Sequence, residues 1–519
     1  MVERPADGQP GGKPLSLWVA TAGATAYASL DADIDVDVAV IGGGIAGLTA
    51  ALALKRAGQT VAVVEAARVG TGVTGHTTGK VTSLHRLAYT ELAGSHGEAA
   101  ARTYGEANQA AIEHIARTVA GEGIDCGFRR VDNYTYAETD DALARVRDEA
   151  SLAARLGLPS AYTSDVPLPF SVKGGVRFDG QAQLHSVKYL QGLAGAVHGD
   201  GSFVFEESPA VSLQDGSPAV VSTERGSVRA RDVIVATNVP FADRGAFDAR
   251  CYAHRSYLTA SLATGPVDDA FRSSSFISVD EPMRSILTVD VDGTGYMLTG
   301  GEGHRASDIG DAAERYGRLA AFARDRLGAG ETAFRWSTQD AMPVDGLPYV
   351  GLMRPDARHV HVITGLRKWG LTNGTAAAII LTDALCGRHN AWAAVFDSNR
   401  PTPVTEALQP APSAAAPTAG AGAQPAGAPS QPAGGRGPAL PAPGEGKVMD
   451  VGGEPTAVYA TTGGQMEAVS AVCTHLGCTV GFNAADLSWD CPCHGSRFAT
   501  DGTVIQGPAT KNLPPRHLP

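Results

Sequence analysis

No hydrophobic run in this sequence of 519 residues approaches the roughly 18 apolar residues that a membrane-spanning helix requires. An excess of basic residues is also missing, because 42 Lys and Arg stand against 54 Asp and Glu and the formal net charge is −12. Nucleic-acid binding would need a basic stripe. The apolar stretch 16–30 is short, interrupted and without the basic flank of a secretory signal or a twin-Arg pair. We therefore expect a soluble, cytoplasmic protein that binds no nucleic acid and has no transmembrane segment.

Cysteine is scarce and unevenly distributed among its seven positions. Cys126, Cys251 and Cys386 are isolated, and scattered cysteines of this kind are expected to be inert buried side chains. The other four all lie between residues 473 and 493. A cluster this dense requires a separate explanation.

Residues 401–446 consist almost entirely of Pro, Ala and Gly, with a few Ser and Gln. This composition has too little apolar side chain to offset the entropy of ordering it, so it predicts a disordered linker. The linker divides the chain into a body, 1–400, and a C-terminal module, 447–519. A Gly-rich coil of this length has a root-mean-square span of roughly 35–40 Å, so we expect the module to move on its tether.

The body begins with a β-α-β pattern in which an apolar strand at 36–41 is followed by a Gly-rich turn, a helix at 45–58 and a strand at 60–65. Helical periodicity recurs at 98–121, 140–157, 186–197 and 311–327, and residues 285–301 alternate like antiparallel strands. We expect a doubly wound α/β domain interleaved with an α+β substrate domain. The module after the linker is predicted to be a small all-β domain. A domain of this size commonly needs a metal or a disulfide to be stable.

A dinucleotide fingerprint occupies the first turn of the body. Gly42, Gly44 and Gly47 form a G-x-G-x-x-G between strand and helix, and Glu65 ends the next strand. Gly42 permits the tight turn, Gly44 lets a pyrophosphate approach the helix N-terminus, Gly47 allows close packing, and Glu65 can bind the ribose. No second fingerprint follows in a strand–turn–helix context, so a separate NAD(P)H domain is not expected.

The C-terminal cysteine cluster combines with histidine in two short loops, CTHLGC and CPCHGS. Cys473, His475, Cys491 and His494 supply two thiolates and two imidazoles, the ligand set of a Rieske [2Fe–2S] centre. A zinc ribbon is the alternative, because Cys and His loops also suit tetrahedral zinc. Both hexapeptides resemble Rieske boxes residue for residue, which favours the cluster.

The segments VAVIGGGIAGLTAALAL, GTGVTGHTTGKVT, AMPVDGLPYVG and VITGLRKWGLTNGTAAAIIL resemble the FAD-dependent D-amino acid oxidase superfamily over most of the body. The resemblance implies an FAD-binding Rossmann-like domain. It also implies that the last segment returns to the flavin, with four residues near the ring: Gly370, Thr372, Asn373 and Gly374. A helix N-terminus there favours the anionic reduced flavin. The alternative for this segment is an ordinary buried helix.

Resemblance to the Rieske proteins of quinol-oxidising complexes implies a disulfide between Cys478 and Cys493 and a hydrogen bond from Ser496 to a cluster sulfur. Phe498 stands where high-potential members have Tyr, so we expect a somewhat lower potential. The disulfide pair argues against a Rieske oxygenase, which generally lacks it and needs an additional mononuclear iron site.

His76 falls where dimethylglycine- and sarcosine-dehydrogenase-like members carry a histidine covalently attached to FAD; a histidine that only packs or hydrogen-bonds is the alternative. Lys80, Arg367 and Lys368 are candidates for stabilising the reduced flavin or orienting a substrate carboxylate, or are solvated surface charges. One run, without a recognisable signature, lies in the expected substrate domain: Tyr252, His254, Arg255 and Tyr257.

These features predict an FAD-dependent dehydrogenase that takes a hydride from a carbon next to nitrogen in a small amine or amino acid. Electrons would pass singly to the Rieske cluster and on to an external acceptor, a protein or a quinone. Two alternatives remain open: a Rieske monooxygenase-like enzyme, and an electron carrier or redox sensor without an amine substrate.

Overall fold

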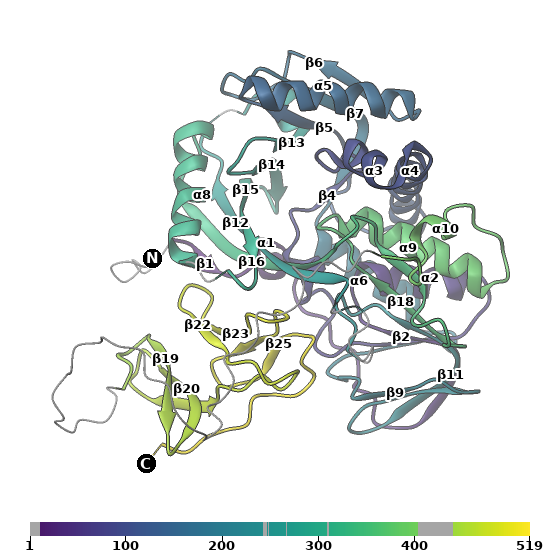
Figure 1. Cartoon of the computed structure of the whole chain (residues 1–519), viewed down its shortest axis with the longest axis vertical. Helices are drawn as coiled ribbons and strands as arrows, with labels where there is room; N and C mark the ends of the chain where they lie inside the picture. The colour runs from purple at the N-terminus through teal and green to yellow at the C-terminus, as the bar shows by residue number, and fades with distance from the viewer. Residues whose placement is uncertain are drawn as a thin grey trace, which may run out of the picture. The chain divides into compact units, whose positions relative to one another are not determined.

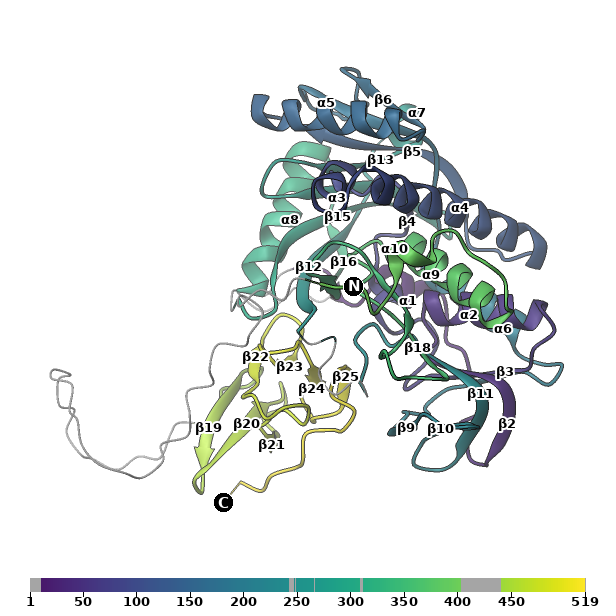
Figure 2. The same ribbon diagram turned by 45° about the vertical axis from the view of Figure 1, so that its right-hand side comes forward.

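The computed structural model describes residues 11–241, 247, 249–265, 267–308, 311–402 and 440–518. The chain forms two compact units, Met1–Pro403 and Val404–Pro519, each drawn in Figures 1 and 2. Most of the linker predicted at 401–446 lies outside the described residues. Its last residue, Gly446, is the first residue of a strand.

An eight-stranded sheet forms the first layer of the larger unit, in the order β17-β18-β11-β2-β3-β8, with β10 and β9 added beside β11. Five strands are parallel: β2 (Ile34–Ile41), β3 (Val61–Val64), β8 (Phe203–Phe205), β11 (Ser227–Val235) and β18 (Val360–Thr364). The antiparallel strands are β9 (Ser212–Gln214), β10 (Ala219–Ser222) and β17 (Tyr349–Leu352). The central strands are almost continuously apolar because both faces are buried.

Helices α2 (Ile45–Arg56) and α9 (Gly370–Leu385) pack against each other beside this sheet, as Figure 2 shows. Gly374 explains their close approach. A β-carbon at this position would lie 3.1 Å from Ile45 Cγ2 and 3.4 Å from the β-carbon of Ala46. The first and last parts of the body therefore meet beside this sheet.

A ten-stranded sheet forms the second layer, in the order β1-β16-β12-β15-β14-β13-β5-β7-β4, with β6 paired to β7. Its strands are β1 (Lys13–Pro14), β4 (Lys80–Val81), β5 (Arg129–Ala137), β6 (Ser160–Thr163), β7 (Gly174–Gln183), β12 (Cys251–Leu262), β13 (Ser274–Ser278), β14 (Arg284–Val291), β15 (Thr294–Arg305) and β16 (Thr332–Pro343). The alternating segment 285–301 is the antiparallel pair β14–β15, as predicted. Because these strands fall between those of the first sheet in the sequence, the interleaved arrangement is confirmed.

The long helices match the periodic segments closely. They are α4 (Glu98–Glu122), α5 (Asp140–Arg155), α6 (Ser186–Val197) and α8 (Ala312–Leu327). Thr139 accepts from the backbone N–H of Ala142 at the start of α5, and Gly328, with φ +66°, ends α8 in the left-handed conformation. The shorter helices are η1 (Val73–His76), α3 (Ala88–His96), α7 (Asp269–Arg272) and α10 (Ala393–Phe396).

The N-terminal apolar stretch contains a helix, α1 (Leu17–Thr21), whose structural role the sequence did not reveal. Leu17 and Trp18 are fully buried in a core cluster with Leu258 and Trp336. This segment is therefore part of the folded body.

The smaller unit is all-β over its described residues 440–518, as predicted. One sheet contains β19 (Gly446–Val451), β20 (Glu454–Ala460) and β21 (Met466–Ser470), and the other contains β22 (Gly481–Asn483), β23 (Ser488–Asp490), β24 (Arg497–Ala499) and β25 (Val504–Gln506). Its core includes Trp489, Phe498, Cys473 and Cys491.

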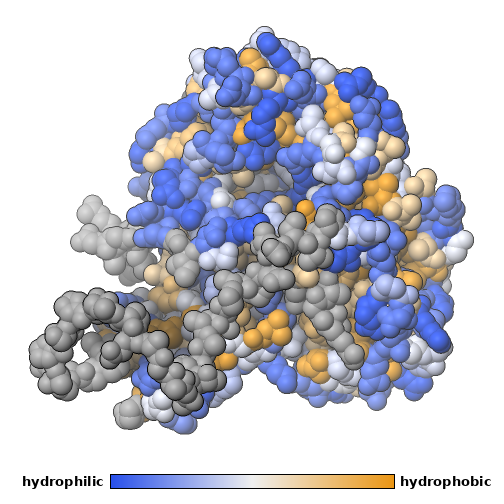
Figure 3. Space-filling view, in the orientation of Figure 1, coloured by the Kyte–Doolittle hydropathy of each residue, from blue (hydrophilic) through white to orange (hydrophobic). Residues whose placement is uncertain are grey.

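Within the described part of the chain, no helix has the length and hydropathy needed to cross a bilayer. The face drawn in Figure 3 is mainly hydrophilic, with apolar residues in small scattered groups.

Candidate flavin and iron–sulfur sites

The Gly-rich turn between β2 and α2 has the geometry that its glycines predict. Gly42 has φ +110°, and a β-carbon there would lie 2.6 Å from the carbonyl oxygen of Ala236. A β-carbon at Gly47 would lie 2.1 Å from the carbonyl oxygen of Gly42. Gly44 precedes the first residue of α2 and has more room, since among the described residues beyond its chain neighbours a β-carbon at this position would have only Thr74 Oγ1 within 4 Å, at 3.4 Å. The turn thus leaves its open side at the helix N-terminus, where a pyrophosphate would bind.

Glu65 supports this turn from the end of β3. Its carboxylate accepts the backbone N–H of Gly43 at 2.6 Å and that of Ala67 at 3.0 Å. Burial raises the pKa of Glu65. Thr74, which the sequence reasoning missed, accepts the N–H of Ile45 at 3.2 Å and so lies at the same helix end. The signal for it in the sequence was a hydroxyl-bearing residue shortly after the GTG that opens the segment GTGVTGHTTGKVT.

The loop carrying η1 is held by side chains from two distant segments. The hydroxyl of Ser16 donates to the carbonyl of Gly75 at 2.5 Å, and the indole of Trp18 donates to that of Thr77 at 2.7 Å. The carbonyl of His76 between them accepts from the indole of Trp336 at 2.9 Å. The ring Nδ1 of His76 lies 2.9 Å from the carbonyl of Gly72. Three successive carbonyls are therefore fixed from outside the loop.

The residues predicted near the flavin at the start of α9 use their side chains within the protein. Thr372 donates to the carbonyl of Thr82 at 2.9 Å, and Asn373 donates to the hydroxyl of Tyr104 at 3.1 Å. Gly370 begins the helix, and Gly374 faces α2. The backbone N–H groups of the first turn, which a helix leaves without internal partners, are what this end can offer a ligand.

Two of the predicted basic residues are likewise committed to structural contacts. Lys80 is buried and donates to the carbonyl of Phe276 at 2.6 Å and to Ser285 at 2.8 Å. Arg367 pairs with Glu91 and also donates to the carbonyl of Gly346 at 3.2 Å. Neither is a solvated surface charge.

Lys368 belongs to a polar cluster that also contains His254, Ser256 and Asp340. Its Nζ donates to Ser256 Oγ at 2.8 Å. His254 on β12 lies directly opposite Asp340 on β16 in the sheet register. Burial lowers the pKa of Lys368 to about 8 and that of His254 to about 3, and it raises the pKa of Asp340 to about 6.

The cluster lies on one defined face of the second sheet. Side chains alternate along a strand, so Trp336 projects to the same side of β16 as Asp340 and contacts the η1 loop through its bond to His76. Arg255 and Gln339 bond to each other at 3.1 Å on the opposite face. The residues of the run at 252–257 therefore lie on two opposite faces of the second sheet. The register of β12 against β16 decides which partner each of them meets.

The cysteine and histidine residues of the smaller unit lie together. Cys473 and Cys491 are buried, and the rings of His475 and His494, both partly exposed, have centroids 5.0 Å apart at 87°. The two thiols hydrogen-bond to each other, which lowers the pKa of Cys473 to about 6 and raises that of Cys491. Backbone N–H groups also point at each sulfur, as thiolate ligands require.

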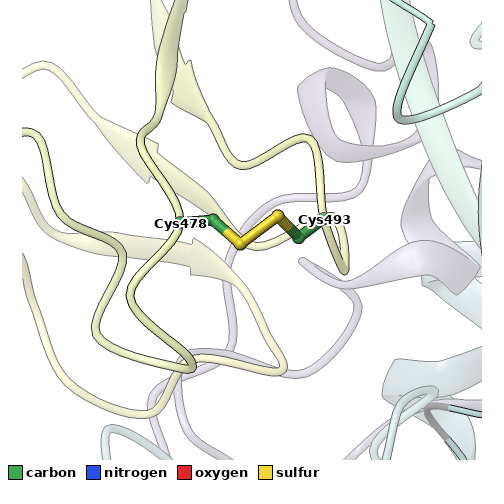
Figure 4. Close-up of a disulfide and its surroundings, with 2 residues drawn as sticks. All are labelled: Cys478 and Cys493. Carbon is green, nitrogen blue, oxygen red and sulfur yellow. A yellow bond between two sulfur atoms is a disulfide. The ribbon is translucent and has the colours of Figure 1, made fainter. Parts of the chain in front are cut away.

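A disulfide joins Cys478 and Cys493 and connects the two cluster loops (Figure 4). The sulfur of Cys491 lies within 4.8 Å of both disulfide sulfurs. Ser496 hydrogen-bonds to the sulfur of Cys473, and Phe498 is buried and offers no hydroxyl.

Paired buried thiols beside two imidazoles fit a Rieske [2Fe–2S] cluster, with Cys473 and Cys491 for one iron and His475 and His494 for the other. The open helix end at Gly44, with Glu65 beneath the turn, fits an FAD pyrophosphate and ribose. Of the isolated cysteines, Cys126 is buried as expected, but Cys251 and Cys386 are partly exposed, because they lie at the margins of the core.

Comparison with protein families gives two matches, FAD dependent oxidoreductase over residues 37–384 and Rieske [2Fe-2S] domain over 438–516. YhfW of Bacillus subtilis, which carries the name of a Rieske 2Fe-2S iron-sulfur protein, is 32% identical over 476 residues, covering 91% of this chain and 92% of that protein.

Gamma-glutamylputrescine oxidoreductase of Escherichia coli is 31% identical over 211 residues, covering 40% of this chain and 49% of that protein. The structure of glycine oxidase from Geobacillus kaustophilus superposes with a TM-score of 0.57 at 20% identity, covering 71% of this chain and all of that one. The likeness to the glycine oxidase structure shows the fold of the body.

Proposed function

Because this chain belongs to the FAD dependent oxidoreductase family and carries a C-terminal Rieske [2Fe-2S] domain, we propose that it dehydrogenates the C–N bond of an amine or amino acid and sends the electrons through its own iron–sulfur cluster. The carrying observation is that one chain holds both a flavin site and a complete Cys₂His₂ ligand set in two compact units. FAD accepts two electrons as a hydride and can release them singly, whereas the cluster accepts one at a time.

The chain's own residues support binding and orientation. The Gly44 turn and Glu65 would hold the dinucleotide part of FAD. The loop with η1, whose carbonyls are bonded from outside it, connects β3 of the first sheet to β4 of the second. The face of β12 and β16 that contacts this loop carries His254 and Asp340 for the substrate, and Lys368 bonds to Ser256 of β12 from the loop before α9. The amine-related names of two similar proteins, gamma-glutamylputrescine oxidoreductase and glycine oxidase, favour a nitrogen-containing substrate. An external acceptor and a cytoplasmic location complete the proposal.

The test is an anaerobic screen of amines and amino acids that follows flavin bleaching and then the EPR signal of the reduced cluster. We expect one substrate class to bleach the flavin first and to produce the cluster signal afterwards. Bleaching without any cluster signal would contradict the internal electron path. A cluster that titrates reversibly while no amine reduces the flavin would instead favour an electron carrier or redox sensor.

A further inference from the structure

We propose that His85 and Tyr104 are positioning residues for the flavin, which hold the first turn of α9 through a chain of directed hydrogen bonds and thereby set the reduction potential of the bound FAD. The inference rests on the FAD site of the proposed function and adds two residues outside the dinucleotide motifs that control it. It depends neither on the amine substrate nor on the iron–sulfur cluster.

The start of α9 lies beside the dinucleotide turn. A β-carbon at Gly374 would lie 3.1 Å from Cγ2 of Ile45, which is the first residue of α2. A dinucleotide whose pyrophosphate binds at the start of α2 therefore lies close to the first turn of α9, whose N–H groups have no partners within the helix. The partial positive charge of such a helix end stabilises a negatively charged ring, so the position of this turn affects the flavin potential.

The contacts of His85 define one tautomer of its ring. Nε2 lies 2.7 Å from the carbonyl oxygen of Thr82, which can only accept, so we infer that Nε2 carries the proton and donates it. In the neutral ring Nδ1 then accepts, and it lies 2.5 Å from the hydroxyl oxygen of Tyr104. Burial lowers the pKa of His85 to about 3, which keeps the ring neutral. The imidazole therefore accepts one hydrogen bond and donates another.

Both ends of this chain reach the first turn of α9. The hydroxyl of Tyr104, which donates to His85, accepts the side-chain N–H of Asn373 at 3.1 Å. The carbonyl of Thr82, which accepts from His85, also accepts the hydroxyl of Thr372 at 2.9 Å. Two adjacent residues of the helix are therefore held by the two partners of one imidazole.

His85 also connects α9 to the second sheet. Its ring stacks on that of Trp369, the residue before the helix, with centroids 4.6 Å apart and planes at 15°. The segment that carries His85 is anchored through Thr82, whose hydroxyl donates to Gln181 of β7 at 2.9 Å and accepts from Asn133 of β5 at 2.8 Å. The start of α9 can therefore shift only if bonds to the second sheet are broken or rearranged.

Burial makes this chain sensitive to the loss of any member. The side chains of His85, Tyr104 and Asn373 are at most 2% exposed. Water cannot readily replace a missing partner at such depth, so a deleted hydroxyl leaves its former partner unsatisfied and favours a shift of the neighbouring groups. A shifted or loosened helix end stabilises the reduced flavin less, which lowers the potential.

The experiment measures the two-electron potential of FAD in the full chain by anaerobic reduction against a reference dye, with the flavin absorption band as the signal. Tyr104→Phe and His85→Phe each keep an aromatic ring and remove its polar atoms. We expect each to lower the potential by at least 30 mV, which is a tenfold change in the equilibrium of a two-electron couple. FAD content should stay unchanged. Because both residues act through one chain, the double variant should show no larger shift than the more affected single variant.

Tyr89→Phe is the matched control. Tyr89 is also fully buried, and its ring packs edge-on against that of Tyr104. Its hydroxyl donates to the carbonyl of Ser83 at 2.6 Å, so it bonds to the same loop as His85 but not to α9 through this contact. We expect the potential to stay within twofold of the parent equilibrium, about 9 mV, even where thermal stability falls.

The inference is overturned if Tyr104→Phe and His85→Phe leave the potential unchanged, if Tyr89→Phe shifts it equally, or if the double variant shows the sum of the single shifts. Thermal unfolding and FAD content identify a variant that fails to fold. Thr372→Val, which removes the bond from the side of the helix, should also lower the potential and then decides the matter.

The outcome is separable from that of the proposed function, because the dye titration uses no amine. Lowered potentials in a protein whose flavin no amine reduces would refute the proposed oxidation and leave the positioning role in place. Amine oxidation with unshifted potentials in the variants would refute the positioning role alone.

Discussion

The indole N–H of Trp336 donates to the backbone carbonyl of His76 at 2.9 Å, so β16 of the second sheet directly fixes the loop next to the dinucleotide fingerprint. Ser16 and Trp18 fix the carbonyls on either side of it. The N-terminal segment therefore helps to fix the loop beside the fingerprint although it lies outside the sequence motifs.

We predict that Trp18→Phe and Trp336→Phe loosen FAD more than they destabilise the fold. Each removes one donor to a partly buried carbonyl, a cost of about 1–3 kcal/mol. Flavin retained after gel filtration should fall several-fold, while the far-ultraviolet circular dichroism stays unchanged. Trp489→Phe in the other unit is the matched control, since its indole bonds to the carbonyl of Thr500. Equal flavin loss in the control would contradict a specific role for the loop.

Gly47→Ala and Gly44→Val should impair the protein in different ways, the first through folding and the second through FAD binding. The β-carbon at Gly47 meets backbone at 2.1 Å and should destabilise the whole body, whereas Gly44 faces the open helix end. Gly44→Val should therefore fold but lose FAD selectively, as judged by thermal unfolding and flavin content. Stoichiometric flavin in Gly44→Val would mean that the pyrophosphate binds elsewhere.

Replacing either His475 or His494 with Ala should abolish the Rieske absorption and EPR spectra and leave FAD content within about 20% of the parent, because these histidines and the dinucleotide fingerprint lie in two different compact units. Metal and flavin analysis of the purified variants checks this. Simultaneous loss of both cofactors would show that the units depend on each other.

Binding of 2-aminoisobutyrate, an amino acid with no hydrogen on the carbon next to its nitrogen, should be tightest between about pH 6 and pH 8, because Asp340 and Lys368 are the charged groups proposed for the substrate. The pKa of Asp340 is raised to about 6, so its carboxylate is charged only above that pH, and the pKa of Lys368 is lowered to about 8, so its ammonium is charged only below that pH. Affinity should fall by up to tenfold per pH unit outside this window. The other charged or titratable neighbours of these groups and of His254 are Arg86, Glu281, His304 and Arg305. A flat calorimetric profile from pH 5 to 9 would exclude this charge pair from binding.

Cleavage between residues 403 and 439 should leave both cofactors bound and flavin reduction by substrate unchanged. It should nevertheless slow cluster reduction at least tenfold at micromolar protein, because the linker that the composition of 401–446 predicts would give an effective concentration on the order of mM. Stopped-flow absorbance of cleaved and intact protein measures the difference. Adding excess free Rieske fragment should restore the rate in proportion to its concentration. Equal rates before and after cleavage would require a stable complex, which sedimentation would detect.

The sequence by itself determined the cofactor-binding motifs and the main elements. Gly42, Gly47 and the helix at 186–197 are local in origin, since a turn conformation or a helical period depends on neighbours along the chain. The cluster loops can also be predicted from local sequence, because two hexapeptides contain the ligand residues at their characteristic spacing.

Only the tertiary structure decided which side chains meet on the polar face of the second sheet. His254 and Asp340 are opposite each other because β12 and β16 pair in one register, and a shift by one residue would exchange the faces. Likewise, Thr372 bonds to the loop before α3 and Asn373 bonds to α4. Trp18 bonds to the loop that carries η1. Such contacts depend on how distant segments pack, and no local pattern in the chain specifies that packing.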